Sequence, residues 1–94
     1  MVSDAHDSTE EPTGSPFGAL VLMLGTAAMV HLGGAPDPAS GATKQDLPQA
    51  KQLIDVLDAL KVKTAGNLTS EEAILLDNLL FDLRMRYLET AKRA

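Results

Sequence analysis

The pattern of apolar and polar side chains predicts three helices, of which the first is the most unusual. No side chain between residues 17 and 32 is charged, and at 100° per residue the apolar side chains lie all the way around the helix. Ser15 and Pro16 suit an N-cap and a first helical turn, and the Gly33-Gly34 pair suits a C-terminal cap. We expect a helix over 17–32 that needs apolar neighbours on every side.

The second helix is predicted from Leu47 to Lys63. Asp46 is a suitable N-cap, and Pro48 lies in the first turn, where its missing N–H costs nothing. The charged side chains lie mostly off a single apolar stripe. That stripe comprises Ala50, Leu53, Ile54, Leu57 and Leu60.

A turn over residues 64–68 separates the second helix from the third. Gly66 suits the left-handed conformation that often follows a helix. Thr69 and Glu72 then form a capping box, with threonine at the N-cap and glutamate three residues later. The third helix is therefore predicted from about Ser70 to Thr90.

The third helix has two apolar faces. One face comprises Ala73, Leu76, Leu79, Leu80, Leu83 and Tyr87, and the other comprises Ile74, Phe81, Met85 and Leu88. Asp77 and Arg84 lie between these faces, two turns apart on the same side. We predict that they form a buried ion pair which fixes register or partner choice. The alternative is an exposed pair of little energetic consequence.

These elements predict one small all-α domain over residues 17–91, preceded by a disordered acidic tail over residues 1–16. The architecture is a three-helix bundle, in which a helical hairpin packs with the hydrophobic first helix. The loop rich in glycine and proline after Leu32 is long enough to cross the end of the bundle.

The charge distribution argues against nucleic acid as a partner. The net charge is −5, and the tail contributes four carboxylates, which leaves eight positive against nine negative side chains elsewhere. Only Phe17, Phe81 and Tyr87 are aromatic, too few for base-stacking platforms. Because cysteine is absent, disulfides and thiolate metal sites are excluded.

The hydrophobic first helix is too short to cross a bilayer. It rises about 24 Å, whereas the hydrocarbon core is about 30 Å thick. No Lys or Arg precedes Lys44, so a secretory signal is not expected either. We favour a buried helix in a cytoplasmic protein. The alternative is a peripheral membrane protein that inserts residues 17–32 into a bilayer.

The number of apolar faces predicts self-association. Two neighbouring helices cover only part of the first helix, so some of its apolar side chains would remain exposed to water. The second apolar face of the third helix would also remain exposed. A two-fold axis hides the same patch on both copies. We therefore expect a homodimer or a larger even-numbered oligomer, with another protein as a further possible partner. The predicted interface comprises Gly18, Val21, Leu22, Gly25, Met29, Phe81 and Leu88, where the glycines allow close backbone approach.

No pattern typical of an active site is present. There is no glycine-rich phosphate loop, no metal-ligand spacing and no nucleophile with a placed base. Asp55 and Asp58 resemble a carboxylate pair, but each has a lysine three or four residues away, which favours exposed ion pairs. We expect no enzymatic activity, cofactor or metal. A pocket lined by Asp77, Arg84 and His31 would argue for an enzyme.

Several short stretches resemble a bacterial family known as domain of unknown function 1844. The most specific are Gly66-Asn67-Leu68-Thr69 and Leu83-Arg84-Met85-Arg86-Tyr87, and the resemblance extends over about residues 17–88. It implies an all-helical, cytoplasmic bacterial protein. It assigns no activity and no catalytic residues. The function expected from the sequence is that of a non-enzymatic helical oligomerisation or adaptor module.

The acidic tail provides the first testable prediction. Deleting residues 2–14 should leave the helical circular dichroism signal and the melting temperature essentially unchanged, because this segment has few apolar groups to pack. A clear fall in melting temperature would show that the tail packs against the domain.

Overall fold

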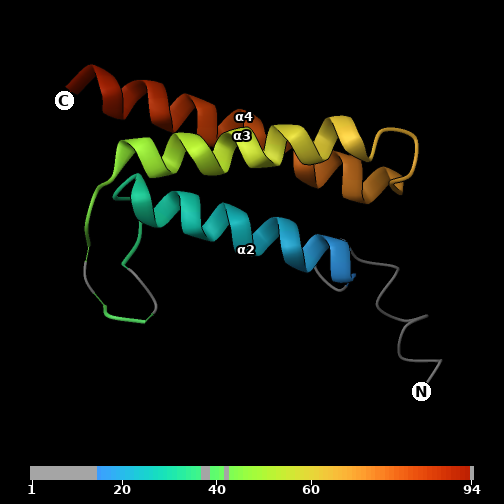
Figure 1. The fold of residues 1–94 in the computed structure, drawn as a ribbon, viewed down its shortest axis with the longest axis horizontal. Coiled ribbons are helices and arrows are strands. Elements are labelled where there is room, and N and C mark those ends of the chain that lie inside the picture. Colours follow the sequence, from blue (N-terminus) through green and yellow to red (C-terminus); the bar gives the residue numbers. More distant parts are fainter. Residues whose placement is uncertain (1–14, 37–38, 42, 94) are drawn as a thin grey trace.

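The computed structural model describes residues 15–36, 39–41 and 43–93, so residues 1–14 of the predicted tail lie outside it. Within these ranges the chain forms three α-helices and no strand, and the all-α three-helix bundle is confirmed. The helices are α2 (Pro16–His31), α3 (Leu47–Lys63) and α4 (Ser70–Arg93) (Figure 1).

The helices α3 and α4 form an antiparallel hairpin, and α2 packs against both (Figure 1). The start of α2 lies at the same end of the bundle as the start of α4, so these two helices run in the same direction. The C-terminal turns of α4 extend beyond the ends of α2 and α3.

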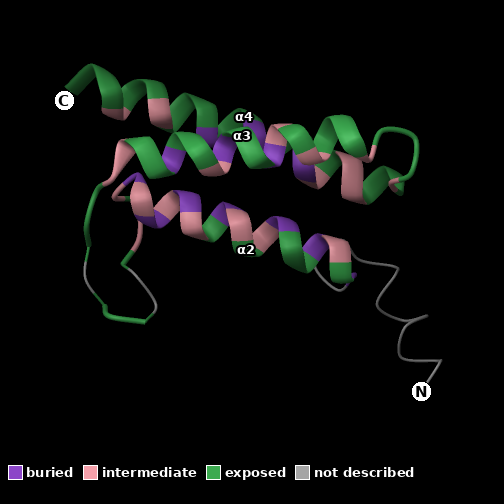
Figure 2. Ribbon diagram, viewed as in Figure 1, coloured by how far each residue is buried: buried purple, intermediate pink, exposed green. Residues whose placement is uncertain are grey.

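The core lies where the three helices meet. Val21, Leu57, Leu76 and Leu83 are completely buried, and Leu80 is almost so. Burying such side chains stabilises a fold by roughly 1.5–3 kcal/mol each. Each helix contributes buried residues to this core: α3 through its predicted stripe, α4 through its first predicted face, and α2 through Val21 and Ala28 (Figure 2).

One side of α2 packs tightly against α4. A Cβ atom added at Gly25 would come within 2.6 Å of Leu79 Cδ2, so no side chain fits there without moving Leu79. Glycine is therefore used for close helix approach, and the neighbour is α4 of the same chain. The opposite side of α2 is less covered, because Leu20 is 40% and Met23 is 68% exposed.

Local signals define the helix ends as predicted. The Asp46 side chain accepts a hydrogen bond from the Gln49 N–H at 3.2 Å. In the capping box, Thr69 Oγ1 accepts from the Glu72 N–H at 3.1 Å, and Glu72 Oε1 accepts from the Thr69 N–H at 3.0 Å. Gly66 has φ +85°, as the turn before this cap requires. The end of α4 lies three residues beyond the predicted Thr90.

The two ends of the segment between α2 and α3 lie close together, at the end of α2 and the start of α3. Gly33 has φ +82°, and the N–H groups of Gly33 and Gly34 donate to the carbonyls of Val30 and Met29, both at 2.9 Å. At the other end, the Asp46 N–H donates to the His31 carbonyl at 2.7 Å. This bond joins the end of α2 to the start of α3.

The contact at Gly25 generates the second prediction. Gly25→Leu should lower the free energy of unfolding by about 1–3 kcal/mol, because the new side chain overlaps Leu79, which packs against the core. Urea unfolding followed by circular dichroism measures the change. Ala19→Leu, at an exposed position of the same helix, should have little effect. Equal midpoints for Gly25→Leu and the parent chain would contradict the packing.

Candidate interaction surface

The side of α4 that faces away from the core carries a row of exposed apolar side chains. We call this row the outer stripe, and it consists of Ile74, Phe81, Met85 and Leu88. These side chains are 58%, 68%, 46% and 59% exposed, respectively. Their spacings of seven, four and three residues place them along one side of the helix. The second apolar face predicted for this helix is therefore uncovered within the chain.

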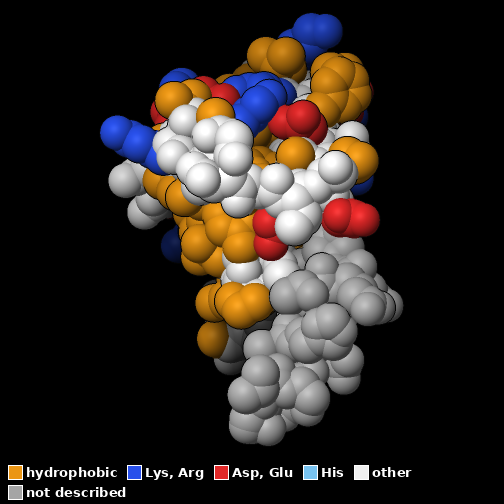
Figure 3. All heavy atoms as spheres, turned by 90° about the vertical axis from the view of Figure 1, so that its right-hand side faces the viewer, with side chains coloured by type: hydrophobic (Ala, Val, Ile, Leu, Met, Phe, Trp, Pro, Cys, Tyr) orange, Lys and Arg blue, Asp and Glu red, His pale blue; other side chains and the backbone are white. Residues whose placement is uncertain are grey.

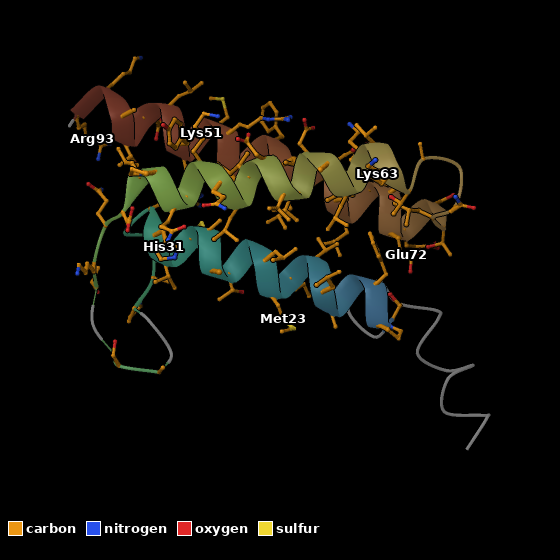
Figure 4. The ribbon with its side chains drawn as sticks, viewed as in Figure 1. Met23, His31, Lys51, Lys63, Glu72 and Arg93 are labelled. Atoms are coloured by element: carbon orange, nitrogen blue, oxygen red, sulfur yellow. The ribbon has the colours of Figure 1, made fainter. Side chains whose placement is uncertain are left out.

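Other apolar side chains reach the surface on α2 and α3. Met23 lies on the side of α2 that points away from α3 (Figure 4). Val62, in the last turn of α3, is 69% exposed. Seen from the end where α2 begins, hydrophobic side chains lie at the surface between basic and acidic ones (Figure 3).

The structure divides the predicted interface residues into two groups. Gly18, Val21 and Gly25 are buried within the chain, which corrects their assignment to an interface between copies. They are buried because α2 turns its small residues toward the other two helices. The remaining residues reach the surface to different extents. Leu22 and Met29 are partly exposed, and Phe81 and Leu88 are exposed.

The prediction of a buried ion pair between Asp77 and Arg84 is wrong. Asp77 Oδ1 lies 2.9 Å from Lys61 Nζ, and Arg84 Nη2 lies 2.8 Å from Asp58 Oδ1. All four side chains are about half exposed. The reason is that this side of α4 faces α3, which offers each residue a partner of opposite charge.

These two salt bridges link α3 to α4 and replace the predicted pair between Asp58 and Lys61. The predicted pair between Lys51 and Asp55 is confirmed, at 3.0 Å. Exposed pairs of this kind each contribute at most about 1 kcal/mol. Both pairs nevertheless form in the same register of the hairpin, and sliding α3 along α4 would separate both.

Glu72 makes a tertiary contact that the sequence did not indicate. Its Oε2 accepts a hydrogen bond from Ser15 Oγ at 3.0 Å, while its Oε1 serves the capping box. Ser15 Oγ in turn accepts from the Gly18 N–H at 2.9 Å, as the N-cap of α2. One carboxylate therefore connects the first turns of α2 and α4. The two residues are 57 positions apart, and no local pattern relates them.

The described residues contain no cluster of three or more His, Cys, Asp or Glu side chains that could hold a metal ion. Asp77 and Arg84 border different surface hollows, of about 200 and 280 Å³, and neither is lined by His31. The pocket that would argue for an enzyme does not form there. Among the same residues, no helix has both the length and the apolar character needed to cross a membrane.

Comparison with known proteins identifies a family. The family model described as "Domain of unknown function (DUF1844)" matches residues 15–89. No curated protein and no solved structure matches the chain.

The salt bridges generate the third prediction. In a double-mutant cycle, Arg84→Met and Asp58→Leu should show a favourable coupling of up to about 1 kcal/mol, because the two side chains are in contact. The matched cycle of Arg84→Met with Asp77→Leu should be additive. Urea unfolding at low salt measures both cycles. A larger coupling energy in the second cycle would show that Arg84 interacts with Asp77 and not with Asp58.

Proposed function

Because the chain belongs to the family of domain of unknown function 1844, whose description assigns no activity, we propose a function from its surface. The protein is a non-catalytic helical module that associates with itself as a homodimer or larger even-numbered oligomer. In this form it acts as an adaptor for another protein in the cytoplasm.

The observation that carries the proposal is the outer stripe. Large apolar side chains scattered singly on a surface are ordinary, whereas a contiguous row is typical of an interaction site. The outer stripe runs through most of α4 and ends on Leu88. Burying it against another protein surface removes this apolar area from water, which favours association.

A second copy of the chain can cover the outer stripe without leaving another apolar row exposed. In a two-fold symmetric dimer the same patch is buried on both chains, so no apolar row is left over. Of the interface predicted from the sequence, Phe81 and Leu88 belong to this surface, and Ile74 and Met85 extend it.

Contact with protein accounts for the exposed residues better than insertion of α2 into a bilayer. Val21 and Ala28 of α2 are completely buried against the other helices. Inserting the whole of residues 17–32 requires α2 to leave the bundle, which would expose Leu57 and Leu80 to water. The outer stripe, in contrast, is available without any change in the fold.

The charged side chains that border the hollows at Asp77 and Arg84 already have partners, which supports a non-catalytic role. In the hollow beside Tyr87, Lys51 pairs with Asp55 and Arg84 pairs with Asp58. A catalytic acid, base or nucleophile instead needs a partner that activates it and room for a substrate.

Self-association is the fourth prediction. Size-exclusion chromatography with multi-angle light scattering should give twice the chain mass of 9.9 kDa, or a larger even multiple, at micromolar concentration. A monomer over the whole accessible concentration range would contradict the proposal. Affinity purification from the native host, with mass spectrometry of co-eluting proteins, tests the adaptor role.

A further inference from the structure

We infer that the outer stripe packs antiparallel against the outer stripe of a second copy, so that α4 pairs with α4. This inference rests on the proposed self-association and specifies its geometry. It follows from the spacing of the exposed side chains and from the distribution of charge along α4.

The exposed side of α4 has the spacing of a coiled-coil seam. Ile74, Phe81 and Leu88 recur every seven residues, and Asn78 and Met85 lie between them at alternating steps of four and three. This is the a/d pattern of two helices that pack by inserting side chains into each other's gaps. The core residues Leu76 and Leu83 lie on the opposite side, so the helix can pack on both sides at once.

The charges of α4 are separated along its length. The half from residue 70 to residue 82 carries four carboxylates and no basic side chain, at Glu71, Glu72, Asp77 and Asp82. The half from residue 84 to residue 93 carries four basic side chains and one carboxylate, at Arg84, Arg86, Lys92, Arg93 and Glu89. Antiparallel pairing places the acidic half of one copy beside the basic half of the other, although Asp77, Asp82, Arg84 and Arg86 already form salt bridges within the chain. Parallel pairing places like charges together, which is unfavourable.

The two ends of the seam show this complementarity most directly. Glu71 and Lys92 fall on the seam line, three heptads apart, and both are exposed. Neither forms a salt bridge within the part of the chain that the structure describes. The point midway between them lies beside Phe81, which is also the middle of the outer stripe. A two-fold axis at that point therefore covers the apolar row and brings each Glu71 to the partner's Lys92.

The absence of native cysteine allows a direct test of orientation, which is the fifth prediction. Ser70→Cys and Ala91→Cys place single thiols at exposed positions near the two ends of α4 and leave every charge in place. The positions lie about 31 Å apart along the helix, beyond the reach of a short bismaleimide. In an antiparallel dimer, a mixture of the two full-length variants should cross-link, and neither variant should cross-link alone.

A second pair of variants tests whether the outer stripe is the surface involved. Phe81→Glu should raise the dimer dissociation constant at least tenfold, because a carboxylate replaces an apolar side chain at the axis. Val62→Glu is the matched control on α3, since Val62 and Phe81 are almost equally exposed, at 69% and 68%. Circular dichroism checks that both variants keep the helical content of the parent.

The possible outcomes separate this inference from the proposed function. A parent chain that is monomeric overturns both. A dimer in which each cysteine variant cross-links to itself is parallel, and it overturns the antiparallel geometry while self-association stands. A dimer that Phe81→Glu leaves intact, or that Val62→Glu disrupts equally, assigns the interface to another face of the bundle.

Discussion

The packing of α2 into the hairpin is the contact on which the whole bundle depends. The helices α3 and α4 alone form only a two-helix layer, and a chain of 94 residues has little apolar surface to spare for its core. The small residues of α2 allow it to come close to both partners, and Val21 and Ala28 are fully buried as a result. The same geometry explains the exposed face, because three helices in contact each keep one side toward the solvent.

Glu72 shows how one side chain can join local and tertiary structure. Its role in the capping box is local, since Thr69 is only three residues away. Its second oxygen receives the Ser15 hydroxyl, which is itself the N-cap of α2. The first turns of two helices are thus held at one end of the bundle (Figure 4). With the bond between His31 and Asp46 at the opposite end of α2, this helix is hydrogen-bonded to the rest of the chain at both of its ends.

The elements that could be predicted from the sequence are those encoded by near neighbours. The start of α3 follows from Asp46 and Pro48, and the start of α4 from a threonine and a glutamate three residues apart. The three-helix bundle follows in turn from three apolar patterns joined by recognisable turns. Each of these signals acts within a few residues, so a single sequence is sufficient to read it.

Contacts between distant segments could not be predicted in the same way. Asp77 and Arg84 share a side of α4, but their spacing says nothing of the opposite charges on α3. Gly25 indicated a close neighbour without indicating that this neighbour is Leu79 of the same chain. Assigning it to a second copy was therefore wrong, although the physical reason for the glycine was correct.

The hydrogen bond between the Asp46 N–H and the His31 carbonyl has a consequence for how the gene can change. It closes the connection between α2 and α3 at its base, so the length of chain beyond that base has little influence on the helices. The entropy of closing a flexible loop grows only with the logarithm of its length, by about 0.6 kcal/mol for each doubling. Insertions between Ala35 and Lys44, beyond the capping glycines of α2, should therefore cost the three helices little stability. A reporter or an entire additional domain inserted there would lie at the end of the bundle where α2 ends, away from the end that contains Glu72.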